Sequence, residues 1–277
     1  MGESECGERL ATGIMENGDR EKRLKVVLIG SGNVATSIAL GLRGKCEPVQ
    51  VFSRSRANAQ ALAEAAGFAE ATDDLRRLRD DADVYVVSVV DDAIAGVVKA
   101  VGDNGGLWLH TSGSVPMSVF AGVRKRYGVL YPMQSFTKGH PADMREVPFF
   151  VEGVNEEETE RVMQFARLMS EHVTVADSEK RRRLHVAAVF ACNFANYMWS
   201  LSAEVLEEGG LDFTAMMPLI RTTVAKLERM SPRDSQTGPA ARGDLDVIRE
   251  HEAMLSGDKK KIYGMLSDSI MKSREKK

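Results

Sequence analysis

The glycines of one short turn could bind a phosphate group. Gly30 and Gly32 follow an apolar run, and Ala35 completes a Gly-x-Gly-x-x-Ala pattern that a helix-like segment continues. Gly30 permits a tight turn, Gly32 lets a diphosphate approach the backbone, and Ala35 lets the helix pack closely on the strand. The first amides of that helix would face the phosphates, which the helix dipole also favours. The segment therefore predicts a dinucleotide cofactor bound by Gly30, Ser31, Gly32, Asn33 and Val34.

The residues that follow the next expected strand indicate which dinucleotide binds. That strand, 49–53, should end near the adenosine ribose, where NAD-preferring proteins carry an acidic residue that binds the 2′-hydroxyl. The segment 53–56, Ser-Arg-Ser-Arg, contains no acidic residue. Ser53 and Arg54 instead offer a hydroxyl and a guanidinium, which suit a 2′-phosphate. We therefore expect NADP rather than NAD, unless this is a solvated loop in which Ser55 caps a helix.

Further candidate ligand-binding residues lie at the ends of three strands further along the chain. Open parallel sheets bind ligands beyond the carboxyl ends of their strands, so these residues should meet at one crevice. Val89 and Val90 should place their backbone along the cofactor. Ser112 and Gly113 should contact the substrate, and Gln134 could bind its carbonyl or carboxylate.

Other residues at the same strand ends have two possible roles each. His110 is either a buried core histidine or an acid/base group near the nicotinamide. Tyr131 and Phe136 could hold a packed loop, in which case Gln134 would have only a structural role. Asp91 and Asp92 suit the start of a helix better than catalysis.

The second half of the chain offers a histidine, an asparagine and an arginine. His185 can donate a proton to a carbonyl or imine, and Asn193, further along the same expected helix, could position it. The alternative is that both make only interhelical hydrogen bonds. Arg242 lies on a glycine-bounded turn, where it could clamp a substrate carboxylate or pair with Asp244. The basic run 180–183 predicts a solvated helix start or, as the alternative, the edge of an anionic pocket.

The elements that must position these residues alternate in the first half of the chain. Short apolar runs at 25–29, 49–53, 84–90 and 107–110 predict buried strands, and 127–130, 148–151 and 172–175 could add further ones. Helical patterns at 33–43, 57–66, 94–101 and 156–170 lie between them. This alternation is typical of an α/β fold with a doubly wound parallel sheet.

After Ala176 the strand signal ends and the pattern is all helical. One long helix is expected from Ser178 to Leu206, followed by helices at 214–230, 244–256 and 259–272. We therefore expect a flexible tail over residues 1–23, a dinucleotide-binding domain over 24–176 and an all-helical substrate and dimerisation domain over 177–277.

Composition excludes several classes of protein. The chain has 277 residues and a net charge of −3, which gives no general reason to expect a nucleic-acid partner. Cys6, Cys46 and Cys192 are scattered, so neither a disulfide framework nor a metal site is expected, and a cytoplasmic location fits. No apolar run is long enough to span a bilayer, and we expect no membrane partner.

Taken together, these motifs resemble a family of Rossmann-like oxidoreductases labelled as NADP oxidoreductase, deazaflavin-coenzyme-dependent. The second half is similar to the helical domain of 6-phosphogluconate dehydrogenase and pyrroline-5-carboxylate reductase, which implies a homodimer through that domain. Hydroxyacid dehydrogenases of the superfamily carry a lysine about where His185 falls, and its absence here argues against 3-hydroxyacid oxidation. The segments that carry the resemblance are Gly30–Ala35, Arg54, His110–Gly113, Tyr131–Phe136, His185, Asn193 and Gly238–Asp244.

The motifs and the resemblance lead to one hypothesis with two alternatives. We expect an NADP-dependent oxidoreductase that transfers a hydride to or from a small polar substrate in a cleft between the domains. His185 would be the acid/base group, with Asn193 as its partner, and Ser112, Gly113, Gln134 and Arg242 would contact the substrate. The first alternative is hydride transfer between NADP and a deazaflavin. The second is a dinucleotide-binding sensor without catalysis.

Overall fold

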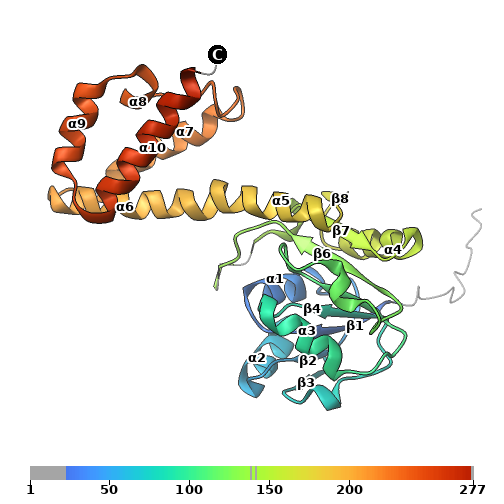
Figure 1. Cartoon of the computed structure of the whole chain (residues 1–277). Helices are drawn as coiled ribbons and strands as arrows, with labels where there is room; N and C mark the ends of the chain where they lie inside the picture. The colour runs from blue at the N-terminus through green and yellow to red at the C-terminus, as the bar shows by residue number, and fades with distance from the viewer. Residues whose placement is uncertain (1–22, 138, 141, 276–277) are drawn as a thin grey trace, which may run out of the picture. The chain divides into compact units, whose positions relative to one another are not determined.

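The computed structural model describes residues 23–137, 139–140 and 142–275. The chain forms two compact units, which meet between Val189 and Phe190 and are described separately here (Figure 1). The expected tail at residues 1–23 lies almost entirely outside the described residues. None of the helices in the described part of the chain is long and apolar enough to cross a membrane.

The first unit is built on a mostly parallel sheet of eight strands in the order β3-β2-β1-β4-β5-β6-β7-β8. All neighbouring strands are parallel except β6 and β7, which are antiparallel. This confirms the expected α/β class with its doubly wound sheet, apart from the reversed direction of the last two strands. The strands are β1 (Lys25–Ile29), β2 (Glu47–Phe52), β3 (Glu70–Thr72), β4 (Val84–Val87), β5 (Leu107–His110), β6 (Tyr127–Pro132), β7 (Phe149–Gly153) and β8 (Val173–Val175).

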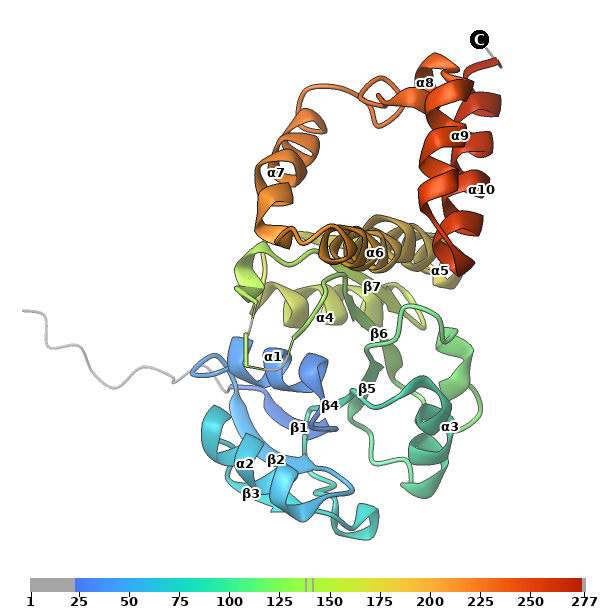
Figure 2. The ribbon, with the colours of Figure 1, turned by 90° about the vertical axis from the view of Figure 1, so that its left-hand side faces the viewer.

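Helices cover both faces of this sheet, because each inner strand is apolar on both sides. On one face, residues of α1, α2 and α4 pack with β-strand residues such as Val26 and Leu28. On the other face, α3 and the 3₁₀ turn η2 pack with Val27, Ile29 and Trp108. Figure 2 shows α1 and α2 on one side of the strands and α3 on the other. The bounds are α1 (Asn33–Gly41), α2 (Arg56–Ala66), η1 (Leu75–Arg77), α3 (Asp91–Ala100), η2 (Met117–Phe120), η3 (Met144–Glu146) and α4 (Glu156–Arg167).

The reversal between β6 and β7 determines where the next helix runs. Since β7 and β8 run opposite to β1–β6, β8 ends at the edge of the sheet where the other strands begin. Helix α5 (Ser178–Ala188) then follows β6 toward its carboxyl end. Its residue Arg181 contacts Glu152, which lies opposite Val129 in the first half of β6, whereas His185 contacts Tyr131 near the end of that strand.

The second unit is helical, as expected, but its core is small. The π-helical turn η4 (Val189–Phe194) links α5 to this unit, so the expected long helix from Ser178 to Leu206 is present but contains a π-helical turn. Of its described residues, only Ala240, Ile248 and Ser267 are buried. The remaining elements are α6 (Ala195–Glu208), η5 (Phe213–Met216), α7 (Met217–Lys226), α8 (Pro239–Arg242), α9 (Leu245–Met254) and α10 (Gly257–Glu275).

The fold differs from the expected elements and boundaries at two places. The three-residue strand β3 was missed, because Glu70-Ala71-Thr72 is too short and too polar to show a strand pattern. Helix α5 packs with the sheet, so the first compact unit ends at Val189 rather than at Ala176, where the sequence pattern changes. The division into functional domains after Ala176 stays a prediction.

Candidate functional site

A groove of about 840 Å³ opens at the carboxyl ends of the strands in the first unit. It brings together every residue predicted to bind the cofactor, three of the four predicted substrate contacts, and His185. The predicted residues that line it are Gly30, Ser31, Gly32, Asn33, Val34, Ser53, Arg54, Val89, Val90, Ser112, Gly113, Gln134 and His185.

The turn between β1 and α1 has the backbone that a diphosphate requires. Gly30 has a φ of +129°, and an added Cβ would lie 1.9 Å from the Ser88 carbonyl oxygen, so only glycine fits. A Cβ on Gly32 would meet no atom within 4 Å and would instead occupy groove space. Helix α1 has neither a side-chain cap nor an acidic residue in its first turn. Its first amides therefore face the groove without a competing negative charge, and the turn fits a dinucleotide diphosphate.

The end of β2 presents a guanidinium near two hydroxyl groups, of which that of Ser53 is buried. Arg54 lines the groove, is exposed and pairs with no carboxylate among the described residues. The Ser53 and Ser31 hydroxyls lie 2.7 Å apart, which ties this strand end to the phosphate turn. Ser55 accepts a hydrogen bond from the Asn58 amide and caps α2, as its alternative reading predicted. The cap and a phosphate-binding Arg54 are compatible, because they use different side chains.

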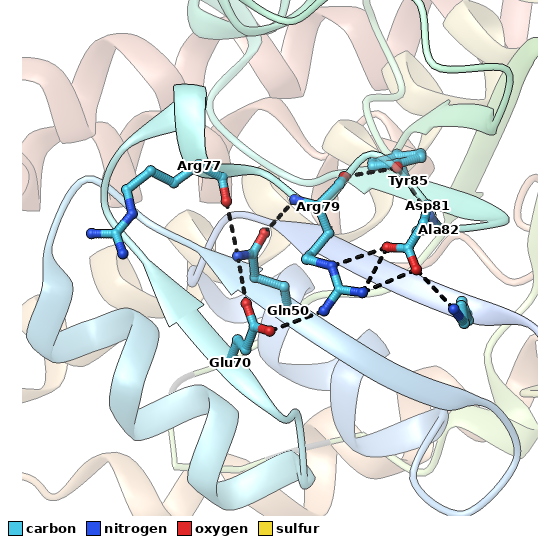
Figure 3. A network of polar contacts seen from close by, with 8 residues as sticks. Gln50, Glu70, Arg77, Arg79, Asp81, Ala82 and Tyr85 are labelled. Carbon is cyan, nitrogen blue, oxygen red and sulfur yellow. Dashed lines mark hydrogen bonds and ion pairs between the residues drawn. The ribbon is translucent and has the colours of Figure 1, made fainter.

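A polar network holds the segment that follows the short strand β3 (Figure 3). Gln50, almost fully buried on β2, donates hydrogen bonds to Glu70 and to the Arg77 carbonyl oxygen, and accepts one from the Arg79 amide. The Arg79 guanidinium in turn bonds Glu70 and Asp81. These contacts fix the segment 75–82, whose first residue, Leu75, lines the groove.

The loop after β5 carries a chain of hydroxyl groups into the groove. The Ser112 hydroxyl accepts hydrogen bonds from the amides of Ser114 and Val115. The Ser114 hydroxyl donates to the Asp91 carboxylate at the start of α3. Asp91 and Asp92 lie in the first turn of α3, with Val90 at the cap position. These hydrogen bonds hold the conformation of the loop. Ser112 lies on the groove wall and is 8% exposed.

His110 is a core histidine in this structure. Its ring is fully buried and stacks on Phe120, and its Nδ1 accepts the Ser112 amide hydrogen. Its Nε2 is buried without a hydrogen-bond partner among the described residues. Burial lowers the pKa of His110 to about 3, with a smaller contribution from the nearby Arg181 charge. His110 thus supports the loop from behind and does not line the groove.

His185 lies in the groove as part of a compact group with a tyrosine and a glycine. Its Nδ1 and the Tyr131 hydroxyl are 3.2 Å apart, and the two rings meet edge to face. A Cβ on Gly113 would lie 2.8 Å from the same Nδ1 and 2.9 Å from the Tyr131 ring. Gly113 is therefore required for the close approach of these three residues. The arrangement can exchange a proton with a substrate group bound in the groove.

The remaining predicted residues in the first unit differ in how they reach the groove. Gln134 is exposed, and its side-chain oxygen accepts the Ser135 amide hydrogen. The Asn33 side chain donates to the Phe136 carbonyl oxygen and so joins the phosphate turn to the loop after β6. Val90 is 67% exposed, which leaves its backbone open to a bound cofactor.

Asn193 and Arg242 belong to the second unit. Asn193 is exposed on the π-helical turn, where the α-helical spacing assumed from sequence does not apply. Arg242 is 65% exposed and forms a 3.8 Å ion pair with Asp244. Their proposed contacts with a substrate stay predictions.

Sequence reasoning overlooked two residues. Tyr131 was weighed only as a packing residue, and its place at a strand end next to Ser112 and Gly113 was the available signal. The run 180–183 was interpreted as solvated, which is wrong for Arg181, because its side chain is 0% exposed. The signal was its position four residues before His185, on the same helix face.

Comparisons with known proteins show the family to which the chain belongs. Two family models match the chain: NADP oxidoreductase, coenzyme F420-dependent, over residues 25–107, and a domain of unknown function, DUF2520, over residues 147–270. A solved structure from Bacteroides fragilis, described provisionally as an NADP oxidoreductase, is 41% identical. It covers 91% of this chain and 99% of its own, with a TM-score of 0.83. The chain belongs to this NADP oxidoreductase family.

More distant members and neighbours share the architecture. A Thermotoga maritima protein is 27% identical, with a TM-score of 0.68 over 91% of this chain and 97% of its own. A reductive aminase from Aspergillus terreus, solved with NADPH, is 14% identical, with a TM-score of 0.69 over 91% of this chain and 95% of its own. At that identity the likeness concerns the fold alone. No protein with a curated description matches the chain.

Proposed function

We propose that this NADP oxidoreductase family member reduces or oxidises a small polar substrate with NADP(H) bound along the groove of its first unit. The observation that carries the proposal is the continuity of the groove from the glycine turn at Gly30 to His185. In this arrangement the first amides of α1 bind the diphosphate, and Arg54 binds the 2′-phosphate. A preference for NADP over NAD follows from the exposed, unpaired guanidinium at that strand end.

The residues at the other end of the groove supply the proton and hold the substrate. The nicotinamide supplies the hydride when the cofactor is bound. In the reducing direction, His185 donates a proton to the carbonyl oxygen or imine nitrogen, and the Tyr131 hydroxyl holds its Nδ1. Ser112, Gly113 and Gln134 line the substrate position. The products are an alcohol or amine and the oxidised cofactor.

The test is oxidation of NADPH, followed at 340 nm, with a panel of keto acids, cyclic and acyclic imines, and a deazaflavin. Turnover with a keto acid or imine, together with a preference for NADPH over NADH, is the expected result. NADPH binding without turnover of any acceptor would contradict the proposal and favour a dinucleotide-binding sensor. Failure to bind either dinucleotide would overturn both.

A second candidate is hydride transfer between NADP and a deazaflavin. It is favoured by the match of residues 25–107 to a family described as coenzyme F420-dependent. That match covers the dinucleotide-binding strands and stops at β5, before the Ser112, Tyr131 and His185 group. Turnover restricted to the deazaflavin in the same panel would support this candidate over the first.

We also propose that the enzyme is a cytoplasmic homodimer assembled through the second unit. That unit has only two buried apolar side chains among its described residues, which is little for an independent fold. A second copy presents the same apolar surface, so a two-fold contact would cover both at once. The exposed apolar residues include Tyr197, Trp199, Leu211, Leu219, Val224, Leu227, Met230, Met254 and Met265.

Sedimentation velocity tests the dimer. The expected result is a single species of twice the chain mass, shifted toward monomer by Leu219→Asp. Lys261→Asp, on an exposed charged position, is the matched control and should leave the dimer intact. A wild-type monomer at micromolar concentration would contradict the assembly.

A further inference from the structure

One buried cation in the first unit takes no part in the proposed chemistry. Arg181 is 0% exposed, although its neighbours in the basic run are open to solvent, with Lys180 71% and Arg183 79% exposed. Its guanidinium donates to Glu152 at 2.6 Å, to the Val115 carbonyl oxygen at 2.7 Å and to the Ser178 hydroxyl at 3.2 Å. Burying a charge is costly even when it is paired, so this contact is poorly explained by stability alone.

The partners of Arg181 come from three different elements. Glu152 lies on β7 and also accepts a hydrogen bond from the Ser178 hydroxyl of α5, at 2.8 Å. The Ser178 hydroxyl accepts one from the Met117 amide, at 3.1 Å. Val115 and Met117 belong to the segment that begins at Ser112 on the groove wall. The ion pair therefore joins β7, the loop after β5 and the start of α5 at one buried point.

This point is one helical turn from His185. Residues four apart on a helix share a face. Fixing Arg181 therefore fixes the rotation of α5 about its axis and its position along that axis, and with them the position of His185. The same guanidinium holds Val115, whose amide donates to the Ser112 hydroxyl next to Gly113. Gly113 and His185 pack so closely that a Cβ on Gly113 would lie 2.8 Å from His185 Nδ1. Arg181 therefore holds both the loop that carries Gly113 and the helix that carries His185.

We propose that Arg181, with Glu152, is a positioning residue that sets His185 and Tyr131 against Gly113 for proton transfer. The inference rests on the proposed function. Charge-assisted hydrogen bonds fix direction as well as distance, which apolar packing at this site would not do. Loss of the pair would therefore loosen the loop and the helix relative to each other while leaving the glycine turn at Gly30 intact.

The test compares three variants with wild type. Arg181→Met/Glu152→Leu removes both charges together, which keeps a buried charge from being left unpaired and so preserves the fold. Arg181→Lys keeps the charge but loses the second nitrogen that holds Val115. Arg183→Met, which removes an exposed ion pair with Glu179 on the same helix, is the matched control.

Two readouts separate the inference from the proposed function. Amide hydrogen exchange of segment 112–117 should rise about tenfold in the double variant and less in Arg181→Lys, with residues 30–34 unchanged. With any acceptor found in the panel, kcat should fall about tenfold while KM for NADPH stays constant.

Unchanged exchange in the double variant would overturn the inference. If exchange rises and kcat holds, Arg181 is structural only and the inference again fails. If wild type turns over no acceptor while exchange rises in the double variant, the proposed function fails, and the rise still shows that Arg181 and Glu152 hold segment 112–117 in place.

Discussion

The two ends of the groove are built on different principles. At the phosphate end, the binding surface is backbone: a turn that only glycine can make and the free amides of α1. At the substrate end, the surface is side chain, with Tyr131 from β6, Gly113 from the loop after β5 and His185 from α5. The first is local in sequence, and the second joins elements that lie up to 72 residues apart, from 113 to 185.

This difference determines how each end should respond to change. A backbone site is specified by conformation, so a single methyl group can abolish it. A side-chain site is specified by the distances between elements, so it can lose activity while cofactor binding persists.

Gly30→Ala should prevent stable folding of the first unit. The added Cβ would overlap the Ser88 carbonyl oxygen at 1.9 Å, and φ at +129° strains any other residue. Together these cost about 3 kcal/mol or more. Gly32→Ala is the matched control: it meets no atom within 4 Å, so it should keep the melting temperature and weaken NADPH binding about tenfold. Thermal unfolding and fluorescence titration check both. An equal loss of stability in the two variants would contradict the steric argument for Gly30.

His185→Ala should lower kcat by about 10²- to 10⁴-fold and leave the Kd for NADPH unchanged, because a general acid acts on the reacting group alone. Steady-state kinetics with an acceptor from the panel measures this effect. Tyr131→Phe should cause a smaller loss, about two- to tenfold, since it removes one hydrogen bond to His185 and keeps the ring. Full turnover by His185→Ala would contradict the role of His185 as the proton donor.

Arg54→Asp should weaken NADPH binding by about 10- to 100-fold and NADH binding little, because only NADPH carries the 2′-phosphate. Titration of each cofactor gives the ratio. Arg56→Asp, two residues further on and at the first position of α2, is the control and should change neither affinity by as much. An equal loss for both cofactors in Arg54→Asp would contradict the assignment to NADP.

His110 should make the first unit sensitive to mild acid. Its pKa is about 3 in the folded protein, against an ordinary value of 6.5, so the unfolded chain binds a proton first as pH falls. The stability it contributes is fully present above pH 6.5 and is lost between 6.5 and 3, about 2 kcal/mol of it between pH 7 and 5. Urea unfolding at both pH values should show this loss in wild type and not in His110→Asn. The exposed His172→Asn should behave as wild type, and an identical pH response in all three would contradict the burial argument.

The alternation of strands and helices and the glycine turn at Gly30 could be predicted from the sequence, because apolar runs and one local motif need no knowledge of tertiary contacts. The order of the strands within the sheet and the short strand β3 were not predicted. Ser112, Gly113 and His185 were identified as candidates, but their meeting point at Tyr131 depends on the antiparallel β7, which periodicity does not reveal. Composition does not show which of four consecutive basic residues turns inward. The spacing of four residues to His185 was the local signal for Arg181, but its main partner, Glu152, lies 29 positions away in the chain.

The path of α5 along β6 limits where the chain can change length. Between Arg181, held at β7, and His185, held at Tyr131, an inserted residue would rotate the histidine about 100° and advance it 1.5 Å. The segment 43–45 before β2 lies at the opposite edge of the sheet, away from the groove, and all three of its residues are exposed. Lineages of this protein should therefore accept insertions and deletions at 43–45 and keep the spacing from 181 to 185 constant.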